Sequence, residues 1–250
     1  MLEPVGIAEL REARAFARRH GASMRSFGAA REARLDLLPG WVDLRAGIVA
    51  DIGANVGDWS AAVLRVVPGA RVLAVEPAPE PLGRLSERFA GVPTVVVDGR
   101  AVSDRVGTAV LHVTGHSHNS SLHAPHDGMG SVYESTTGWE VVARVATPTT
   151  TLDELLAGED VALLKLDVQG AESEVLRGAR DVLGRTAAVL IEVTFVSHYD
   201  GDATFPALHE QLSAHGFSLN ALSEPFRAQR GAGSFLWADA CYCRGIPSAR

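Results

Sequence analysis

Five short apolar segments dominate the middle of the chain, and turn residues separate them from segments with a helical pattern. The helical patterns cover 58–67, 79–90 and 171–183, and the apolar segments cover 47–52, 71–76, 93–98, 161–167 and 187–193. The hydrophobic residues in each apolar segment are nearly continuous, which is typical of strands in a parallel sheet covered on both faces. Strand–helix–strand repetition predicts an α/β fold with an open, doubly wound, mainly parallel sheet and helices on both faces.

Other apolar segments add strands outside this repetition. Residues 216–222 and 234–243 predict a strand pair that places antiparallel strands at one edge of the sheet, near the C-terminus. Two further strands are expected at roughly 108–113 and 141–147. The polar segment 115–139 between them is rich in Gly and Ser and has no clear period. Because long irregular loops inside compact domains usually carry function, we expect a lid-like insertion here.

The first 40 residues differ in texture from the rest of the chain. Alanine and arginine are frequent there, and the patterns at 7–20 and 28–38 predict helices. We therefore expect an N-terminal helical extension over 1–40 and one main domain over 41–250. This extension could cover a pocket or form a homodimer contact, and the sequence leaves that open.

Composition narrows the class of protein. A chain of 250 residues that is 46% hydrophobic can bury one sizeable core. The net charge is -7 and no basic stripe is present, which argues against a nucleic-acid partner. No apolar segment reaches the length of a membrane span, and the N-terminus lacks the apolar stretch of a signal peptide. We expect a cytoplasmic protein in which Cys241 and Cys243 are small core residues.

The segment VADIGANVGDWS (49–60) is the first candidate for chemistry. In open parallel sheets, ligands bind at the carboxyl ends of the strands, and this segment lies at such an end. Gly53 and Gly57 allow the backbone to turn tightly and to approach a ligand, and Asp51 and Asn55 add polar groups. Glu76 ends the next strand, where a carboxylate can accept hydrogen bonds from both hydroxyls of a ribose.

Two classes of ribose-containing cofactor compete for this segment: a dinucleotide and S-adenosylmethionine. Dinucleotide sites require G-x-G-x-x-G, which places the pyrophosphate on a helix N-terminus. Here the spacing is G-x-x-x-G after an acidic residue, as in the glycine loop of class I methyltransferases. The spacing therefore disfavours a nicotinamide-dependent oxidoreductase, which stays the second hypothesis. A non-catalytic cofactor-binding scaffold is the third.

Several motifs in one order resemble the FkbM family of S-adenosylmethionine-dependent methyltransferases, over roughly residues 45–220. The resemblance implies a class I fold with a seven-stranded sheet, and methyl transfer that is commonly to a hydroxyl oxygen. The motifs are VLAVEPAPEPLGRL (72–85), AVSDRVGTAVLHV (101–113), NSSL (119–122), TLDELL (151–156), VALLKLDVQGAESEVLRGA (161–179) and LIEVTF (190–195).

The resemblance implies specific roles in binding the cofactor. Glu76 would hold the ribose diol, the backbone at Ala101 would lie near the adenine, and Asp167 would face the reaction centre. The methionyl and ribose side would lie on the glycine loop, at Asp51, Gly53, Asn55 and Gly57. One departure is Gln169, where many relatives have Glu, and it removes a charge while keeping hydrogen-bonding capacity.

The base that removes the acceptor's proton is not determined by the sequence. Asp167, His198 and His118 are the candidates, and Asp167 could instead contact the cofactor ammonium or bind a metal. Five histidines lie between 112 and 126, but their spacing matches no standard ligand set, and we expect no metal.

The resemblance also suggests the acceptor, a hydroxyl on a small molecule such as a sugar, glycolipid or polyketide-like natural product. Asn119, Glu192 and Tyr199 are the candidate residues for binding it. Tyr133 and Trp139 could form an apolar wall beside it, or could anchor the loop that carries them. Nothing in the loop identifies the compound.

Overall fold

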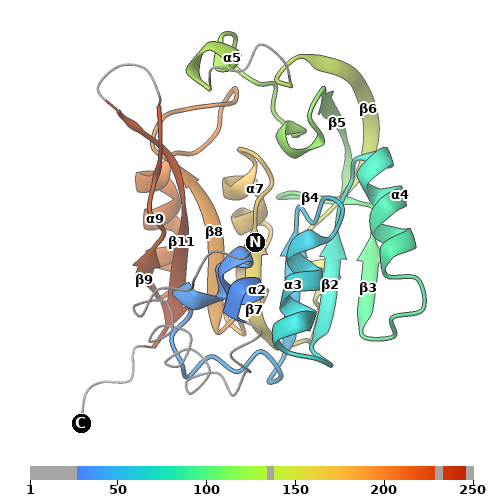
Figure 1. The fold of residues 1–250 in the computed structure, drawn as a ribbon, viewed down its shortest axis with the longest axis vertical. Coiled ribbons are helices and arrows are strands. Elements are labelled where there is room, and N and C mark those ends of the chain that lie inside the picture. Colours follow the sequence, from blue (N-terminus) through green and yellow to red (C-terminus); the bar gives the residue numbers. More distant parts are fainter. Residues whose placement is uncertain (1–26, 134–137, 229–232, 246–250) are drawn as a thin grey trace, which may run out of the picture.

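The computed structural model describes residues 27–133, 138–228 and 233–245 (Figure 1). Its main sheet has the strand order β10-β11-β8-β7-β1-β2-β3, and β9 also pairs with β11. The strands are β1 (Ile48–Ile52), β2 (Arg71–Val75), β3 (Val95–Asp98), β7 (Val161–Leu166), β8 (Ala188–Thr194), β9 (Phe217–Leu222), β10 (Phe226–Arg227) and β11 (Phe235–Arg244).

The strand directions confirm the predicted fold class. β3, β2, β1, β7 and β8 are parallel neighbours, whereas β11 runs antiparallel to β8, β9 and β10. All seven predicted strands of this sheet are present, and the eighth is the two-residue strand β10. β1, β2, β7 and β8 are buried almost without interruption, as their continuous apolar sequences require, whereas the edge strand β3 is only partly buried.

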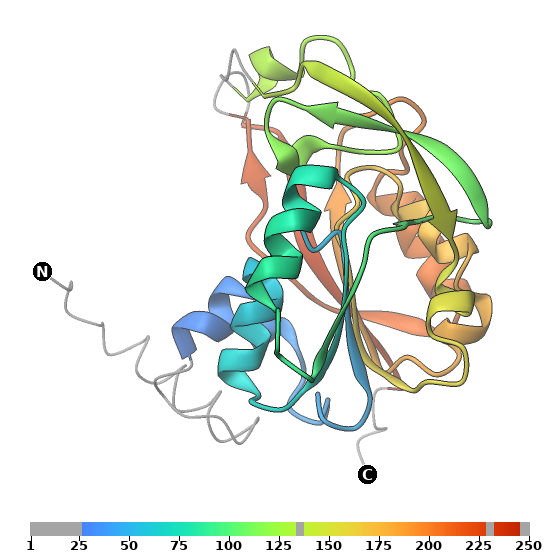
Figure 2. The same ribbon diagram turned by 90° about the vertical axis from the view of Figure 1, so that its right-hand side faces the viewer.

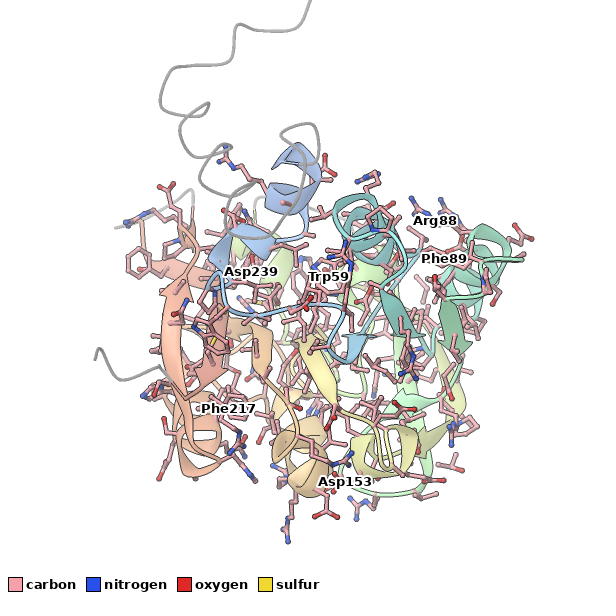
Figure 3. The ribbon with its side chains drawn as sticks, turned by 90° about the horizontal axis from the view of Figure 1, so that it is seen from below. Trp59, Arg88, Phe89, Asp153, Phe217 and Asp239 are labelled. Carbon is pink, nitrogen blue, oxygen red and sulfur yellow. The ribbon has the colours of Figure 1, made fainter. Side chains whose placement is uncertain are left out.

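Helices cover both faces of the sheet (Figure 2). One face packs against α2 (Phe27–Glu32), the 3-10 helix η2 (Leu35–Leu37), α3 (Asp58–Val66) and α4 (Pro79–Arg88). The other packs against α6 (Leu152–Leu155), α7 (Glu172–Arg177), α8 (Arg180–Leu183) and α9 (Phe205–Ala214). Figure 3 shows Trp59 and Asp239 on the α2 side and Asp153 on the opposite side.

The helices differ from the sequence prediction in three places. The expected helix 171–183 is divided into α7 and α8 at Gly178, where a Cβ atom would collide with the carbonyl oxygen of Ser103. The expected helix 28–38 ends at Glu32, and Arg34 beyond it is left-handed, with φ 55°. The helix α9 was not predicted, although Pro206 in its first turn is a common start signal. The predicted helix 7–20 lies outside the described residues.

A smaller sheet carries the insertion. It consists of β4 (Ala101–Val102), β5 (Gly107–Thr114) and β6 (Val141–Thr150), in the order β4-β6-β5. Between β5 and β6 the chain forms a 3-10 turn, η3 (Ser117–Asn119), and the short helix α5 (Met129–Val132). Figure 1 shows this part of the chain above the ends of β2 and β3. No helix in the described part of the chain is long and apolar enough to cross a membrane.

Candidate functional site

A cavity of about 480 Å³ lies at the carboxyl ends of the parallel strands. Strand ends and the loops after them supply its floor, including Gly53, Glu76, Asp167 and Glu192, and the insertion supplies residues 116–122. A second cavity of about 280 Å³ adjoins it on the side of α2 and α3. The two cavities share six lining residues, which are Gly53, Asn55, His118, Asp167, Glu192 and Trp237.

Gly53 and Gly57 allow the loop after β1 to pack closely against other parts of the chain. Gly53 and Gly57 both have φ 83°, a conformation that L side chains rarely adopt. A Cβ atom on Gly53 would collide with the carbonyl oxygen of Asp167, and one on Gly57 would lie 2.6 Å from Phe89 Cε2. Both glycines are therefore required for a close approach to other parts of the chain, and Gly53 also lines both cavities. Gly57 does not line either cavity.

Glu76 is the carboxylate at the end of β2, and the backbone holds it at two points. Its Oε2 accepts a hydrogen bond from the Asn55 N–H at 2.9 Å, and its Oε1 accepts one from the Ala78 N–H at 2.8 Å. Only 7% of the residue is exposed, and this burial raises the pKa of Glu76 to about 7 although both hydrogen bonds lower it. Ala101 lines the same part of the cavity, as the sequence interpretation expects.

Asn55 joins the glycine loop to the insertion. Its backbone is left-handed with φ 48°, and its Nδ2 lies 3.2 Å from Ser117 Oγ. Its own Oδ1 accepts a hydrogen bond from the Val56 N–H. The side chain thus fixes the loop after β1 against η3, where the insertion meets the cavity.

Asp51 lies behind the cavity instead of lining it. It is fully buried, its Oδ2 accepts a hydrogen bond from Ser60 Oγ at 2.6 Å, and its Oδ1 accepts one from Lys165 Nζ at 3.0 Å. Because strands β1 and β7 are neighbours, Asp51 and Lys165 are register partners. Both oxygens of the Asp51 carboxylate thus have partners within the protein, and the cofactor contact predicted for Asp51 stays a prediction.

Lys165 extends this interaction to the cavity. Its Nζ also donates to the Gly53 carbonyl oxygen at 3.2 Å and lies 3.4 Å from Asp167 Oδ2. The neighbouring carboxylates of Asp51 and Asp167 keep the pKa of Lys165 above its ordinary value despite burial. Lys165 therefore carries a buried positive charge that positions both Asp167 and the glycine loop.

Gln169 connects two carboxylates on neighbouring strands. Its Nε2 donates to Asp167 Oδ1 at 2.8 Å and lies 3.3 Å from Glu192 Oε1, while its Oε1 accepts from the Tyr199 hydroxyl at 2.9 Å. Gln169 is one of the few non-glycine residues with a positive φ, 57°. A backbone conformation of this kind at a site is held by its surroundings, here the hydrogen bonds of the amide.

The other candidate residues occupy different positions around this network. Tyr199 is 2% exposed and does not line either cavity, and its hydroxyl lies within hydrogen-bond distance of Gln169 Oε1 and the Asn119 carbonyl oxygen. The acceptor contact predicted for it stays a prediction. Asn119 lines the larger cavity, with its Nδ2 bonded to the Gly138 carbonyl oxygen. His118 lines both cavities and is exposed. Glu172 caps the start of its own helix by accepting from the Val168 and Gly170 N–H groups.

His198 lies in an aromatic part of the larger cavity. Its Nε2 is 3.0 Å from the Tyr133 hydroxyl, and burial lowers the pKa of the imidazole. Tyr133 stacks on Trp139 at 5.2 Å and on Phe226 at 5.8 Å between ring centroids. Phe226 in turn stacks on Trp237 at 5.6 Å. These four rings and His198 form an apolar wall beside the carboxylates of the strand ends.

Carboxylates on neighbouring strands lie close together on the face of the sheet that α2 covers. Glu192 on β8 is the register partner of Asp239 on β11, and Asp239 accepts a hydrogen bond from Arg34 Nε at 2.8 Å. With Asp51 and Asp167, four carboxylates thus gather here against the two cations Lys165 and Arg34. No lysine or arginine lines the larger cavity among the described residues. The site consequently favours a cationic ligand over an anionic one.

Sequence reasoning missed Lys165, Arg34, Trp237 and Asp239 as parts of this site. Lys165 could have been predicted as part of the site, because it lies inside an otherwise apolar strand and a buried lysine requires a partner of opposite charge. Trp237 and Asp239 alternate on β11, but nothing in the sequence shows which strand lies beside β11. Within the described residues, no group of three His, Cys, Asp or Glu side chains is placed to hold a metal ion.

A family model described as the methyltransferase FkbM domain matches residues 51–219, more than half of the chain. This chain belongs to the FkbM family of S-adenosylmethionine-dependent methyltransferases. The match runs from the end of β1 into β9 and includes Gly53, Glu76, Asp167 and Glu192. The membership accounts for the order of motifs that the sequence contains.

Two curated proteins and one solved structure illustrate the relationship. The chain is 27% identical to the 2-O-methyltransferase NoeI of Sinorhizobium fredii, covering 66% of this chain and 70% of NoeI. It is 29% identical to the 31-O-demethyl-FK506 methyltransferase FkbM of Streptomyces tacrolimicus, covering 75% of this chain and 79% of that protein. A structure of methyltransferase FkbM from Methylobacillus flagellatus has a TM-score of 0.49 and 13% identity, covering 93% of this chain and 59% of the other.

Proposed function

We propose that this FkbM-family protein binds S-adenosylmethionine and transfers its methyl group to a hydroxyl oxygen of a small molecule. One observation carries the proposal. A single cavity is lined by Glu76, a carboxylate held at two points, and by the further carboxylates Asp167 and Glu192. S-adenosylmethionine has matching chemistry, with a ribose diol at one end and a sulfonium and an ammonium at the other.

The residues on the adenosine side fit the cofactor. Glu76 would accept hydrogen bonds from the ribose hydroxyls, because Asn55 and Ala78 already fix the orientation of its carboxylate. Val75, Pro77 and Ala101 line the cavity next to it and would border the adenine. The apolar character of these neighbours suits a flat heterocycle.

The residues on the methionyl side fit equally well. Asp167 lines both cavities and is held in place by Lys165 and Gln169, so it could accept a hydrogen bond from the cofactor ammonium. Gly53 and Asn55 also line both cavities. S-adenosylmethionine supplies an electrophilic methyl group when it is bound, and the protein supplies alignment and an electrostatic environment.

The aromatic wall supports an acceptor that has an apolar face as well as a hydroxyl. Trp139, Phe226 and Trp237 present ring surface next to the carboxylates of the strand ends. The two curated relatives are named for O-methylation, one as a 2-O-methyltransferase and one as a 31-O-demethyl-FK506 methyltransferase. We infer that the acceptor is a sugar, a glycolipid or a polyketide-like compound.

The second hypothesis, a nicotinamide-dependent oxidoreductase, fits the cavity less well. A dinucleotide would place two phosphates beside Glu76, Asp167 and Glu192, and the described lining of the larger cavity offers no lysine or arginine to balance them. The scaffold hypothesis gives no reason for Lys165 and Gln169 to hold Asp167 in one orientation.

Calorimetric titration with S-adenosylhomocysteine, and separately with NAD, tests the cofactor. Binding of S-adenosylhomocysteine at micromolar strength without binding of NAD is the expected result, and the reverse pattern would refute the proposal. Release of S-adenosylhomocysteine from S-adenosylmethionine in the presence of methyl glycosides, chitin oligomers and macrolides then tests the acceptor class. Binding of S-adenosylhomocysteine without turnover of any acceptor would favour the scaffold hypothesis, and binding of neither cofactor would refute the proposal.

A further inference from the structure

We propose that Glu192 is the catalytic base that takes the proton of the acceptor hydroxyl, while Asp167 serves to bind and orient the cofactor. This inference rests on the proposed function. Glu192 lies on β8 and lines both cavities, as does Asp167. A cofactor held between Glu76 and Asp167 would therefore present its methyl group close to Glu192.

The hydrogen bonds of the two carboxylates differ. Both oxygens of Asp167 are engaged, since Gln169 Nε2 donates to Oδ1 at 2.8 Å and Lys165 Nζ lies 3.4 Å from Oδ2. Glu192 has a single contact of 3.3 Å from Gln169 Nε2 to Oε1. Among the described residues no donor lies on its Oε2. Glu192 therefore keeps one oxygen without a partner in the protein, whereas the protein positions both oxygens of Asp167.

The histidine candidates are less suited to this step. His198 is 3% exposed, and its Nε2 is already 3.0 Å from the Tyr133 hydroxyl. His118 is exposed, on a 3-10 turn of the insertion, and its position depends on that short element. Glu192 instead lies on a central strand between β7 and β11, which gives it a fixed position.

The surroundings of Glu192 raise the pKa of its carboxyl group, which makes the carboxylate a stronger proton acceptor than an exposed one. Burial raises its pKa above the ordinary value, and the charges of Asp167, Glu172 and Asp239 raise it further, while Lys165 opposes them. The hydroxyls of Tyr133 and Tyr199 also interact electrostatically with Glu192. A raised pKa strengthens a carboxylate as the acceptor of a hydroxyl proton.

The step balances in atoms and charge. The acceptor oxygen forms a bond to the methyl carbon, the carbon–sulfur bond breaks with its electron pair going to sulfur, and the hydroxyl proton passes to Glu192. The proton then leaves Glu192 for water. Because the sulfonium becomes a neutral thioether, the positive charge that favoured the Glu192 carboxylate disappears as the proton arrives.

This charge change gives a test that needs no acceptor. S-adenosylmethionine and S-adenosylhomocysteine differ in charge only at sulfur, so binding of the first should displace a proton from Glu192 that binding of the second leaves in place. Calorimetry near pH 6.5 in two buffers of different ionisation enthalpy measures this release, which we expect to approach one proton at most. Glu192→Gln should abolish the difference between the two ligands and keep the affinity for S-adenosylhomocysteine.

Glu174→Gln is the matched control, because Glu174 is a partly buried carboxylate on α7 that pairs with His123 and Arg177 outside both cavities. This variant should keep the difference in proton release. If the two ligands still differ in proton release in Glu192→Gln, the proton does not come from Glu192, and this assignment is refuted while the proposed function stands. Failure of the wild-type protein to bind either ligand would refute the proposed function, and the assignment with it.

Turnover with the acceptor found in the screen gives the second test. Glu192→Gln should lower kcat by at least about 100-fold, which is the usual effect of losing a base, and should keep the affinity for S-adenosylhomocysteine. Formate should restore part of the activity of Glu192→Ala, because a small carboxylate can enter the space that the side chain leaves. Near-normal kcat in Glu192→Gln, or no formate effect on Glu192→Ala, would overturn the proposal.

Discussion

The buried pair of Asp51 and Lys165 offers a sharp test of how this site is held together. Lys165→Met removes the ammonium and keeps a chain of similar length. Asp51 has no exposed surface, and the Lys165 side chain is 11% exposed, so water cannot replace the missing cation. After the substitution Asp51 keeps its hydrogen bond from Ser60 and no opposite charge within the described structure.

The expected loss of stability follows from this burial. Breaking a buried ion pair by removing one partner costs about 3–5 kcal/mol, because the remaining charge is left uncompensated. For a chain of this size, about 2–4 °C of Tm correspond to 1 kcal/mol, so Tm should fall by about 6–20 °C. The double variant Asp51→Asn/Lys165→Met should recover much of this loss, since it removes the uncompensated charge as well.

Urea denaturation and thermal melting of the wild-type protein, both single variants and the double variant measure these values. Arg88→Met is the control, because Arg88 pairs with Asp58 at the surface, where the Asp58 side chain is 77% exposed, and the loss should stay below about 1 kcal/mol. A loss in Lys165→Met as small as that of the control would show that Asp51 does not depend on Lys165. Additive losses in the double variant would contradict the coupling.

Three further predictions concern the glycine loop, the ribose carboxylate and the aromatic wall. Gly53→Ala should lower the free energy of unfolding, measured by urea denaturation, by about 1–3 kcal/mol more than Gly69→Ala does, because both glycines have a left-handed φ but only a Cβ at position 53 would collide with Asp167. Equal losses in the two variants would refute the collision. Glu76 has a pKa of about 7 and must be ionised to accept hydrogen bonds from both ribose hydroxyls, so the affinity for S-adenosylhomocysteine, measured by calorimetry, should rise about tenfold from pH 6 to pH 8. Glu76→Gln should bind weakly at every pH, and a rise that persists in this variant would contradict the assignment. Phe226→Ala should raise the acceptor KM and leave S-adenosylhomocysteine affinity unchanged in steady-state and calorimetric assays, and an unchanged KM would exclude the wall from acceptor binding.

The sequence alone was sufficient for the sheet and for its carboxyl-end site. Continuous apolar segments such as 161–167 and 187–193 require burial on both faces, and only a covered parallel sheet provides it. Residues that follow such strands, Glu76 and Asp167 among them, were therefore predictable as cavity residues, and both line the cavity. Boundaries and breaks were less predictable, because the division at Gly178 depends on the carbonyl group of Ser103, which is distant in sequence.

Only the tertiary structure decided which of these side chains face a ligand and which face each other. Asp51 and Lys165 are 114 positions apart, and they meet because β1 lies beside β7. The same strand order brings Gln169 between Asp167 and Glu192, and Asp239 next to Glu192. A motif fixes the type of residue at a strand end, but the neighbours that set its charge and hydrogen bonds come from other strands. Their identity follows from the order of the strands in the sheet, which local sequence does not encode.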